Sequence, residues 1–174
     1  LHLEIVVQRL EREYDISLIT TTPGVIYKLE LNDGKLIDLQ NPSSMPEASL
    51  IKTFKEPWIV ATIITPDEYL GSIIKICEEK RGLQIDMSYS GNRVVLKYDM
   101  PLNEVVFDFY DRLKSMTSGY ASFDYEISKY KEGDLIKLSI IVNEEPVDAL
   151  STIIHKDFAQ QQGKLICEKL KDLI

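Results

Sequence analysis

The sequence predicts an α+β protein whose central part has a ferredoxin-like β-α-β-β-α-β arrangement. Four extended patterns lie between residues 58 and 130, and one helical pattern follows the first of them while a second precedes the last. This order is the split βαβ arrangement, in which a central hairpin lies between two crossover helices. Two helices on one face of a four-stranded antiparallel sheet bury the apolar sides of both layers, so we expect that sandwich.

The first strand and the first helix are marked by one continuous segment. Residues 58–64 form an uninterrupted apolar run, which is typical of a central strand covered on at least one face. Thr65 is expected to cap the following helix, Pro66 suits its first position, and Glu68 stands where a capping box places its carboxylate. We expect this helix to end at Gly82, in the left-handed conformation that glycine adopts readily.

The next two strands are predicted from alternation. Apolar and polar residues alternate over residues 83–89, which indicates a half-buried strand. Gly91 and Asn92 then form a tight-turn signal between two extended runs. The second run, residues 93–100, is expected to direct three side chains into the core: Val94, Leu96 and Tyr98.

The second helix and the last strand complete the unit. Pro101 is expected to open the helix and Gly119 to close it. Its apolar residues recur on one side: Leu102, Val105, Val106, Phe109 and Leu113. In the last strand, Phe123, Tyr125 and Ile127 alternate with polar residues, and we expect them under the helices. The alternative, base stacking by Phe123, Tyr125 and Tyr130 as in RNA-recognition motifs, lacks the K/R-G-F/Y-G/A-F signature.

The flanking segments are less regular. Residues 3–14 form an amphipathic helical pattern, 19–22 are strand-like, and 25–31 and 35–39 are extended runs joined by an Asn-Asp-Gly turn. Residues 41–56 are interpreted as a linker with a domain boundary, because their start is rich in turn-forming residues. A further strand is expected over 135–142, and a helix from about 158 to the end. Since helical patterns reach both ends of the sequence, we expect a fragment of a longer protein.

Composition excludes several classes of protein. The chain of 174 residues is 44% hydrophobic and 28% charged, with a net charge of −8. That charge argues against non-specific wrapping of nucleic acid, although local basic spots remain compatible with a partner made of RNA and protein. No apolar run approaches the roughly 20 residues that a membrane helix needs, and residues 1–14 are too charged for a signal peptide. Cys77 and Cys167 are expected to be core thiols in a reducing cytosol.

The motifs of enzymatic chemistry are absent from this sequence. It has no GxxxxGK[ST] phosphate loop and no GxGxxG, so we expect no GTP binding, no catalytic residue and no cofactor or metal site within it. His155 lies four residues after Ser151 without a GxSxG motif, which favours a structural role over a hydrolase. Asp157 is expected to cap the last helix. The alternative for this segment is that His155 and Lys156 contact a phosphate.

Several strings resemble translational GTPases. LHLEI (1–5) and RLEREY (9–14) resemble the third domain of elongation factor G. The rest resembles the LepA (elongation factor 4) family, and this covers essentially the whole chain. The strings are LITTTP (18–23), NPS (41–43), EP (56–57), IITPDEYLG (63–71), RG (81–82), GYASFDYE (119–126), and VN with PVDAL within 142–150. In elongation factor G a fourth domain follows the third, whereas here the linker leads straight to the β-α-β-β-α-β unit.

The LepA resemblance implies a domain plan. Residues 1–40 would close a third domain, 41–56 would be the linker, 57–145 would resemble the fifth domain of elongation factor G, and 146–174 would open the family's own C-terminal domain. It also implies a ribosome-bound GTPase, proposed to promote back-translocation of tRNAs and translation fidelity. GTP and Mg belong to the full-length protein, whose GTPase domain would lie upstream.

The same resemblance implies partners and a location. The partners would be the ribosome, through large-subunit rRNA and the stalk-base protein, and tRNA. The location would be cytoplasmic, with peripheral association of the full-length protein with the inner face of the cell membrane. The candidate RNA contacts are the basic residues Lys80, Arg81, Arg93, Lys97, His155 and Lys156. Two alternatives stay open: these side chains are merely solvated, or the chain is a free-standing ferredoxin-like regulatory module that binds a small metabolite.

Overall fold

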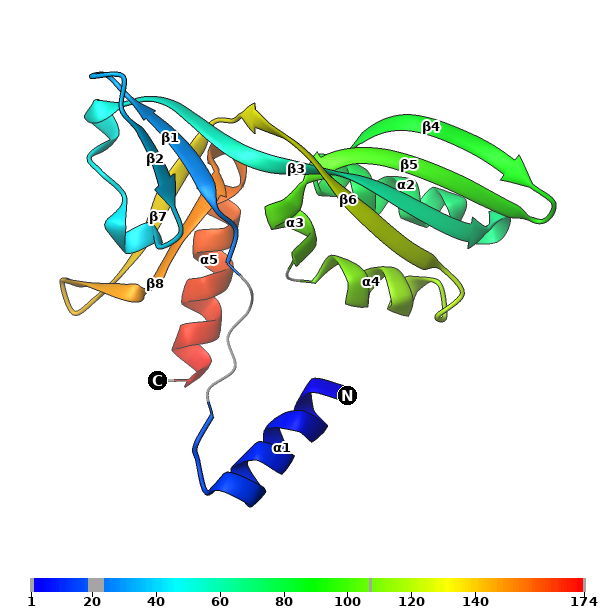
Figure 1. The fold of residues 1–174 in the computed structure, drawn as a ribbon, viewed down its shortest axis with the longest axis horizontal. Helices are drawn as coiled ribbons and strands as arrows, with labels where there is room; N and C mark the ends of the chain where they lie inside the picture. Colours follow the sequence, from blue (N-terminus) through cyan, green and yellow to red (C-terminus); the bar gives the residue numbers. More distant parts are fainter. Residues whose placement is uncertain (1, 19–23, 107, 174) are drawn as a thin grey trace.

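The ferredoxin-like unit forms as predicted. The computed structural model describes residues 2–18, 24–106 and 108–173. The elements of the unit are β3 (Ile51–Pro66), α2 (Leu70–Glu79), β4 (Leu83–Ser90), β5 (Arg93–Pro101), α3 (Leu102–Val106), α4 (Phe109–Met116) and β6 (Ser122–Glu132). The strands lie in the order β6-β3-β5-β4, all antiparallel, with α2, α3 and α4 on one face of the sheet (Figure 1).

The core of this unit lies between the sheet and the helices. Alternate residues of β5 are fully buried, which confirms the inner face of Val94, Leu96 and Tyr98. They pack with every second residue of β3 and with the inward sides of the helices: Ile59, Ala61, Ile63, Ile73, Ile76, Cys77, Val105, Phe109 and Leu113. Period-two burial in the strands and helical periodicity above them thus meet in a single apolar layer.

The first strand is longer than expected. β3 begins at Ile51, inside the segment interpreted as a linker, and four of its first five residues pair with β1 (Tyr27–Leu31). The hairpin of β1 and β2 (Leu36–Leu39) therefore extends the same sheet. The strand also continues through Pro57, which lies beside a β-bulge, where a strand tolerates proline.

A second, smaller core joins the β1–β2 hairpin to the C-terminal part. β7 (Leu135–Val142) was expected, whereas β8 (Glu145–His155), its antiparallel partner, was not. Six buried side chains from β1, β2, β3, β7 and β8 meet there: Tyr27, Leu29, Leu39, Phe54, Leu135 and Ile153. The helix α5 (Lys156–Leu173) packs against β7 and β8 (Figure 1).

Both helix-end predictions for the first helix are wrong in detail. Thr65 is buried at the end of β3 and donates its hydroxyl hydrogen bond to the Pro66 carbonyl, and a 3-10 turn (Asp67–Tyr69) precedes α2 without a side-chain cap. The residue with positive φ is Arg81, at 58°, not Gly82. Gly82 is required for space instead, because a Cβ there would lie 2.8 Å from the Cys77 carbonyl oxygen. The second helix is likewise two helices, α3 and α4.

Burial was overestimated on both edge strands. All eight residues of β4 are exposed, although alternation predicted a half-buried strand. On β6, register places Tyr125 and Ile127 on the helix face, yet both are exposed and only Phe123 packs against the core. The layer of helices is too narrow to cover the outer strands. Alternation therefore predicts which side chains share a face of the sheet, but not whether a helix covers that face.

The N-terminal helix α1 (His2–Tyr14) leaves its apolar stripe exposed at Val6, Leu10 and Tyr14. The strand expected over 19–22 lies outside the described residues. Among the helices that the structure describes, none combines the length and the apolar character needed to cross a membrane.

The two cysteines are predicted to differ sharply in reactivity. Cys77 is buried in the main core, and burial, with the nearby Glu78 charge, raises its pKa to about 12. Cys167 is exposed on α5, so the expectation of a core thiol is wrong for it. Because the thiolate is the reactive species, iodoacetamide at pH 8 should label Cys167 rapidly and Cys77 only after unfolding. Mass spectrometry with and without urea measures this, and equal labelling in the native state would contradict the buried position.

Candidate functional site

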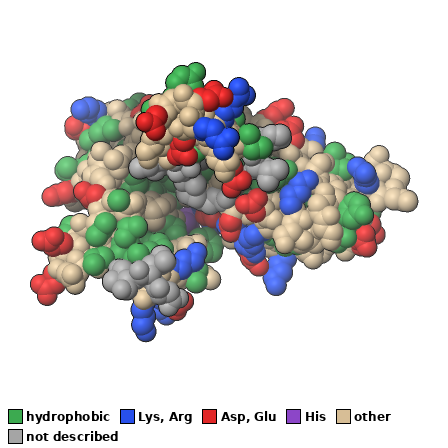
Figure 2. Space-filling model, turned by 90° about the horizontal axis from the view of Figure 1, so that it is seen from below, with side chains coloured by type: hydrophobic (Ala, Val, Ile, Leu, Met, Phe, Trp, Pro, Cys, Tyr) green, Lys and Arg blue, Asp and Glu red, His purple; other side chains and the backbone are tan. Residues whose placement is uncertain are grey.

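The basic residues predicted as RNA contacts fall into three separate places. Arg93 and Lys97 lie on β5, Lys80 and Arg81 follow α2, and His155 and Lys156 lie where β8 meets α5. Figure 2 shows that, on the face it presents, Lys and Arg side chains stand among Asp and Glu side chains rather than gathering in one area. Local geometry must therefore decide which of them is available to a phosphate.

Arg93 and Lys97 form the most accessible basic pair. Arg93 directly follows the two-residue turn, and both side chains are exposed. Because Val94 and Leu96 point into the core, Arg93 and Lys97 lie on the opposite, helix-free face of the sheet. Among the described residues, neither side chain forms an ion pair within 4.0 Å. We call Arg93 and Lys97 the β5 basic pair.

Arg81 is held by structural partners instead. Its Nη1 and Nη2 donate to the two carboxylate oxygens of Glu56 at 2.7 and 2.9 Å, and its Nε lies 3.4 Å from Glu104 Oε1. The Arg81 side chain is 15% exposed and that of Glu56 only 1%. Burial opposes the charge of Arg81, but the hydrogen bonds and charges of the two carboxylates outweigh it and raise its pKa. Arg81 makes these contacts from a backbone position with a positive φ of 58°.

Lys80 is engaged as well. Its Nζ lies 2.7 Å from Asp108 Oδ1, and its side chain is mostly buried. Lys80 and Arg81 thus connect the end of α2 with β3, α3 and the start of α4. They do not form one surface with the β5 basic pair, and their contact with RNA stays a prediction.

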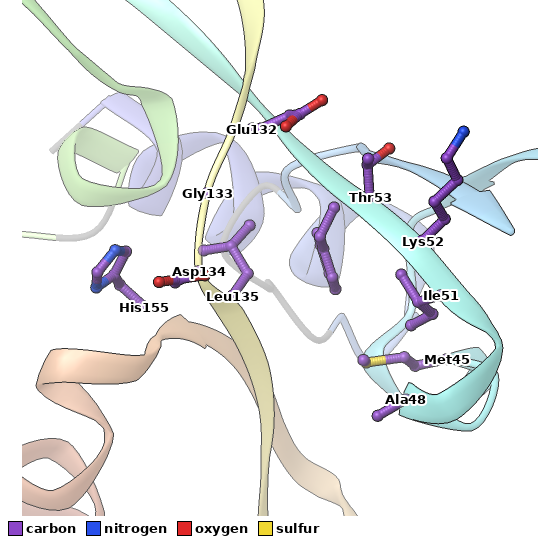
Figure 3. Close-up of a pocket in the computed structure, with 11 residues that line it drawn as sticks. Met45, Ala48, Ile51, Lys52, Thr53, Glu132, Gly133, Asp134, Leu135 and His155 are labelled. Atoms are coloured by element: carbon purple, nitrogen blue, oxygen red, sulfur yellow. The ribbon is translucent and has the colours of Figure 1, made fainter. Parts of the chain in front are cut away.

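A cavity of about 580 Å³ lies where β3, the β6–β7 connection and the end of β8 meet. In Figure 3, Asp134 and His155 are drawn on one side of Leu135, and Met45, Ala48 and Ile51 on the other. Lys52 and Glu132 also line this cavity. Its charges are of both signs, which does not favour a phosphate ligand. In the part of the chain that the structure describes, no three His, Cys, Asp or Glu side chains gather in a way that suits a metal ion.

His155 has a local structural role. Its Nδ1 accepts a hydrogen bond from the Asp157 backbone N–H at 3.4 Å, and its ring lies 6.0 Å from that of Phe158. The helix α5 already begins at Lys156, so the prediction of Asp157 as its N-cap is wrong. Ser151 lies four residues earlier on the same strand, about 13 Å away along β8, too far for a nucleophile–base pair. Lys156 is exposed, and its backbone N–H donates to the Asp134 carbonyl.

Comparison with known proteins decides the family. A family model described as "Elongation factor G C-terminus" matches residues 53–141, just over half of the chain. The chain belongs to the elongation factor G C-terminus family. A solved structure from Thermus thermophilus is 28% identical, with a TM-score of 0.44, and the match covers 46% of this chain and 12% of that one.

The elongation factor G C-terminus match contains the whole ferredoxin-like unit except the first two residues of β3. It includes the β5 basic pair and the Glu56–Arg81–Glu104 cluster, whereas His155 and Lys156 lie outside it. Sequence reasoning missed Glu56 as the partner of Arg81. The available signal was a carboxylate directly before Pro57 and an apolar run, a position where an acid needs a partner.

Proposed function

We propose that this chain is the ribosome-binding C-terminal portion of a translational GTPase that resembles LepA. The observation that carries the proposal is the order of its parts. Only residues 40–50 separate β2 from β3, and β3 pairs with β1. No fourth domain fits in that interval, which favours the LepA plan over that of elongation factor G.

The β5 basic pair supports a contact with ribosomal RNA. Both cations are exposed on the helix-free face of the sheet, whereas Lys80 and Arg81 are neutralised by carboxylates. Exposed cations on a rigid strand can reach phosphates without first breaking an ion pair. Because the chain is acidic overall, such a contact would be local, weak and sensitive to salt.

The activity of the whole protein remains part of this proposal. GTP and Mg would bind upstream, and the full-length protein would act on tRNA positions or translation fidelity in the cytoplasm, with peripheral membrane association. Its further partners would be the stalk-base protein and tRNA. The LepA-like strings of the sequence support these assignments.

Replacing Arg93 and Lys97 together with Ala should weaken co-sedimentation with ribosomes. If each contacts one phosphate, the log–log salt dependence of binding should flatten by roughly 2 units. The matched control is Lys35→Ala with Lys75→Ala, which removes the same charge from exposed positions elsewhere. Unchanged affinity of the Arg93 and Lys97 double variant across a salt series, with intact folding, would show that this surface is not the one that binds.

A metabolite-binding module would behave differently. The chain would not sediment with ribosomes at any salt concentration, and its melting temperature would rise with an amino acid or a nucleotide. Thermal-shift measurements on the same preparation separate the two functions.

A further inference from the structure

Tyr120, in the loop between α4 and β6, is held in a fixed position although it is 66% exposed. Its backbone N–H donates to the Thr117 carbonyl at 2.9 Å. The next residue, Ala121, is buried, and its N–H donates to the Thr117 hydroxyl at 3.2 Å. Lys114 Nζ donates to the Ala121 carbonyl at 2.6 Å. The loop is therefore ordered before any partner binds, which lowers the entropy that binding costs.

The ring of Tyr120 is the outer member of an aromatic stack. It lies 6.4 Å from the ring of Tyr69, and the two planes differ by 15°. Tyr69 packs against the main core in turn. The inner ring is thus anchored, whereas the outer ring is mostly exposed and can stack on a further planar group.

This stack lies at the end of the ferredoxin-like unit that carries Arg93. Arg93 pairs with Pro66 at the end of β3, and Ser122 pairs with Ile64 on the other side of that strand. The α4–β6 loop, the end of β3 and the β4–β5 turn therefore share one end of the sheet (Figure 1). Since β5 and β6 flank β3, their backbones lie about 10 Å apart. A cation and a stacking ring so placed can contact neighbouring nucleotides of one RNA strand.

Two carboxylates beside the stack favour a base over a phosphate as its ligand. Asp67 and Glu68 directly precede Tyr69, and both are exposed. Among the residues that the structure describes, neither forms an ion pair within 4.0 Å. Such carboxylates repel phosphate but accept hydrogen bonds from amino groups of bases, as they do from N4 of cytosine. Only an unpaired base offers both its face and that edge.

We infer that Tyr120 is a stacking platform for an unpaired RNA base that carries an amino group, while Arg93 contacts a phosphate of the same strand. The inference rests on the proposed ribosome binding and adds the kind of RNA element that is contacted, a loop or bulge rather than a regular helix. Aromatic stacking supplies affinity with little dependence on sequence, and the nearby cation supplies attraction to the backbone.

The first test compares the ribosome affinity of variants of Tyr120 by co-sedimentation. Tyr120→Leu keeps an apolar cover on Tyr69 but cannot stack on a base, so affinity should fall about 5- to 150-fold. Tyr120→Phe should bind like wild type. Because no charge changes, the salt dependence should keep its slope, unlike that of the Arg93 and Lys97 double variant. Tyr14→Leu, which alters an equally exposed tyrosine of α1, is the control. Equal affinity of Tyr120→Leu and wild type, with intact folding, overturns the inference.

The second test identifies the partner of the stack. Dimethyl sulfate methylates unpaired adenine and cytosine bases, so a base covered by the chain is protected from it. Wild type and Tyr120→Phe should protect the same unpaired base of ribosomal RNA, and Tyr120→Leu should not. A loss of affinity in Tyr120→Leu with unchanged protection would assign the stack to a ribosomal protein and overturn the inference.

A third measurement does not depend on the ribosome. Stacking quenches the fluorescence of 2-aminopurine, so the wild-type chain should quench a short oligouridine that carries one such base, whereas Tyr120→Leu should not. If the chain quenches this RNA but does not sediment with ribosomes, the proposed function fails and the stacking platform stands. If it sediments with ribosomes but neither quenches this RNA nor protects a base, the stacking platform alone fails.

Discussion

Replacing Glu56 with Gln is expected to destabilise the folded chain by about 3 kcal/mol, toward the lower end of the range for breaking a buried ion pair. The substitution keeps the size of the side chain but removes the charge that faces the Arg81 guanidinium in two hydrogen bonds. Arg81 stays largely buried, so its charge loses its principal partner. Glu104, at 3.4 Å, retains part of the attraction and keeps the loss from being larger. Urea denaturation, read as a shift of the midpoint at constant slope, measures the effect.

Two controls make this prediction specific. Glu56→Leu combined with Arg81→Met should be less destabilising than the sum of the single changes, because both charges leave together. Glu30→Gln removes one partner of the more exposed pair with Lys52 and should change stability little. Similar losses for Glu56→Gln and Glu30→Gln would show that burial of the ion pair is not what matters.

Local patterns in the sequence were sufficient to predict the ferredoxin-like unit. The alternation around Leu96 and the helical spacing of Val105, Phe109 and Leu113 depend on neighbours in the chain, and all four residues are buried. Tight turns are also local: Gly91 has a φ of 61° between β4 and β5. These features were therefore predictable before any tertiary contact was known.

The features that depend on distant contacts were not predictable in the same way. Apolar residues alternate along β4 as they do along β5, so burial was predicted for both strands. Of the two, only β5 lies under α2, and β4 is exposed. Likewise, Glu56 and Arg81 are 25 residues apart and meet only because α2 crosses the sheet. A charged side chain in a sequence does not reveal whether solvent or a carboxylate surrounds it. That is why six basic candidates were named, although carboxylates hold two of them, Lys80 and Arg81.

The missed strand β8 has a related cause. Its sequence, from Glu145 to His155, mixes polar and apolar residues, and its burial is intermediate for most positions. Ile153 is its one fully buried side chain, and it joins a core built mainly from β1, β2 and β3. A strand that pairs along one side with β7 and contributes a single residue to a core has weak periodicity. Only the tertiary arrangement identifies it.

Phe109→Ala is expected to cost about 3–5 kcal/mol, the range for removing a large aromatic side chain from a packed core. Phe109 is fully buried among the residues of the main core, and its ring centroid lies 5.3 Å from that of Phe123. The chain offers a control at the next position, because Tyr110 is half exposed and makes only peripheral contacts with Phe123 and Lys114. Tyr110→Ala should therefore cost well under about 1 kcal/mol, as surface substitutions usually do. Urea midpoints of both variants measure the two losses of stability. Equal losses would mean that Phe109 does not lie on the inner face of α4, and that the core beneath β6 is not packed as described.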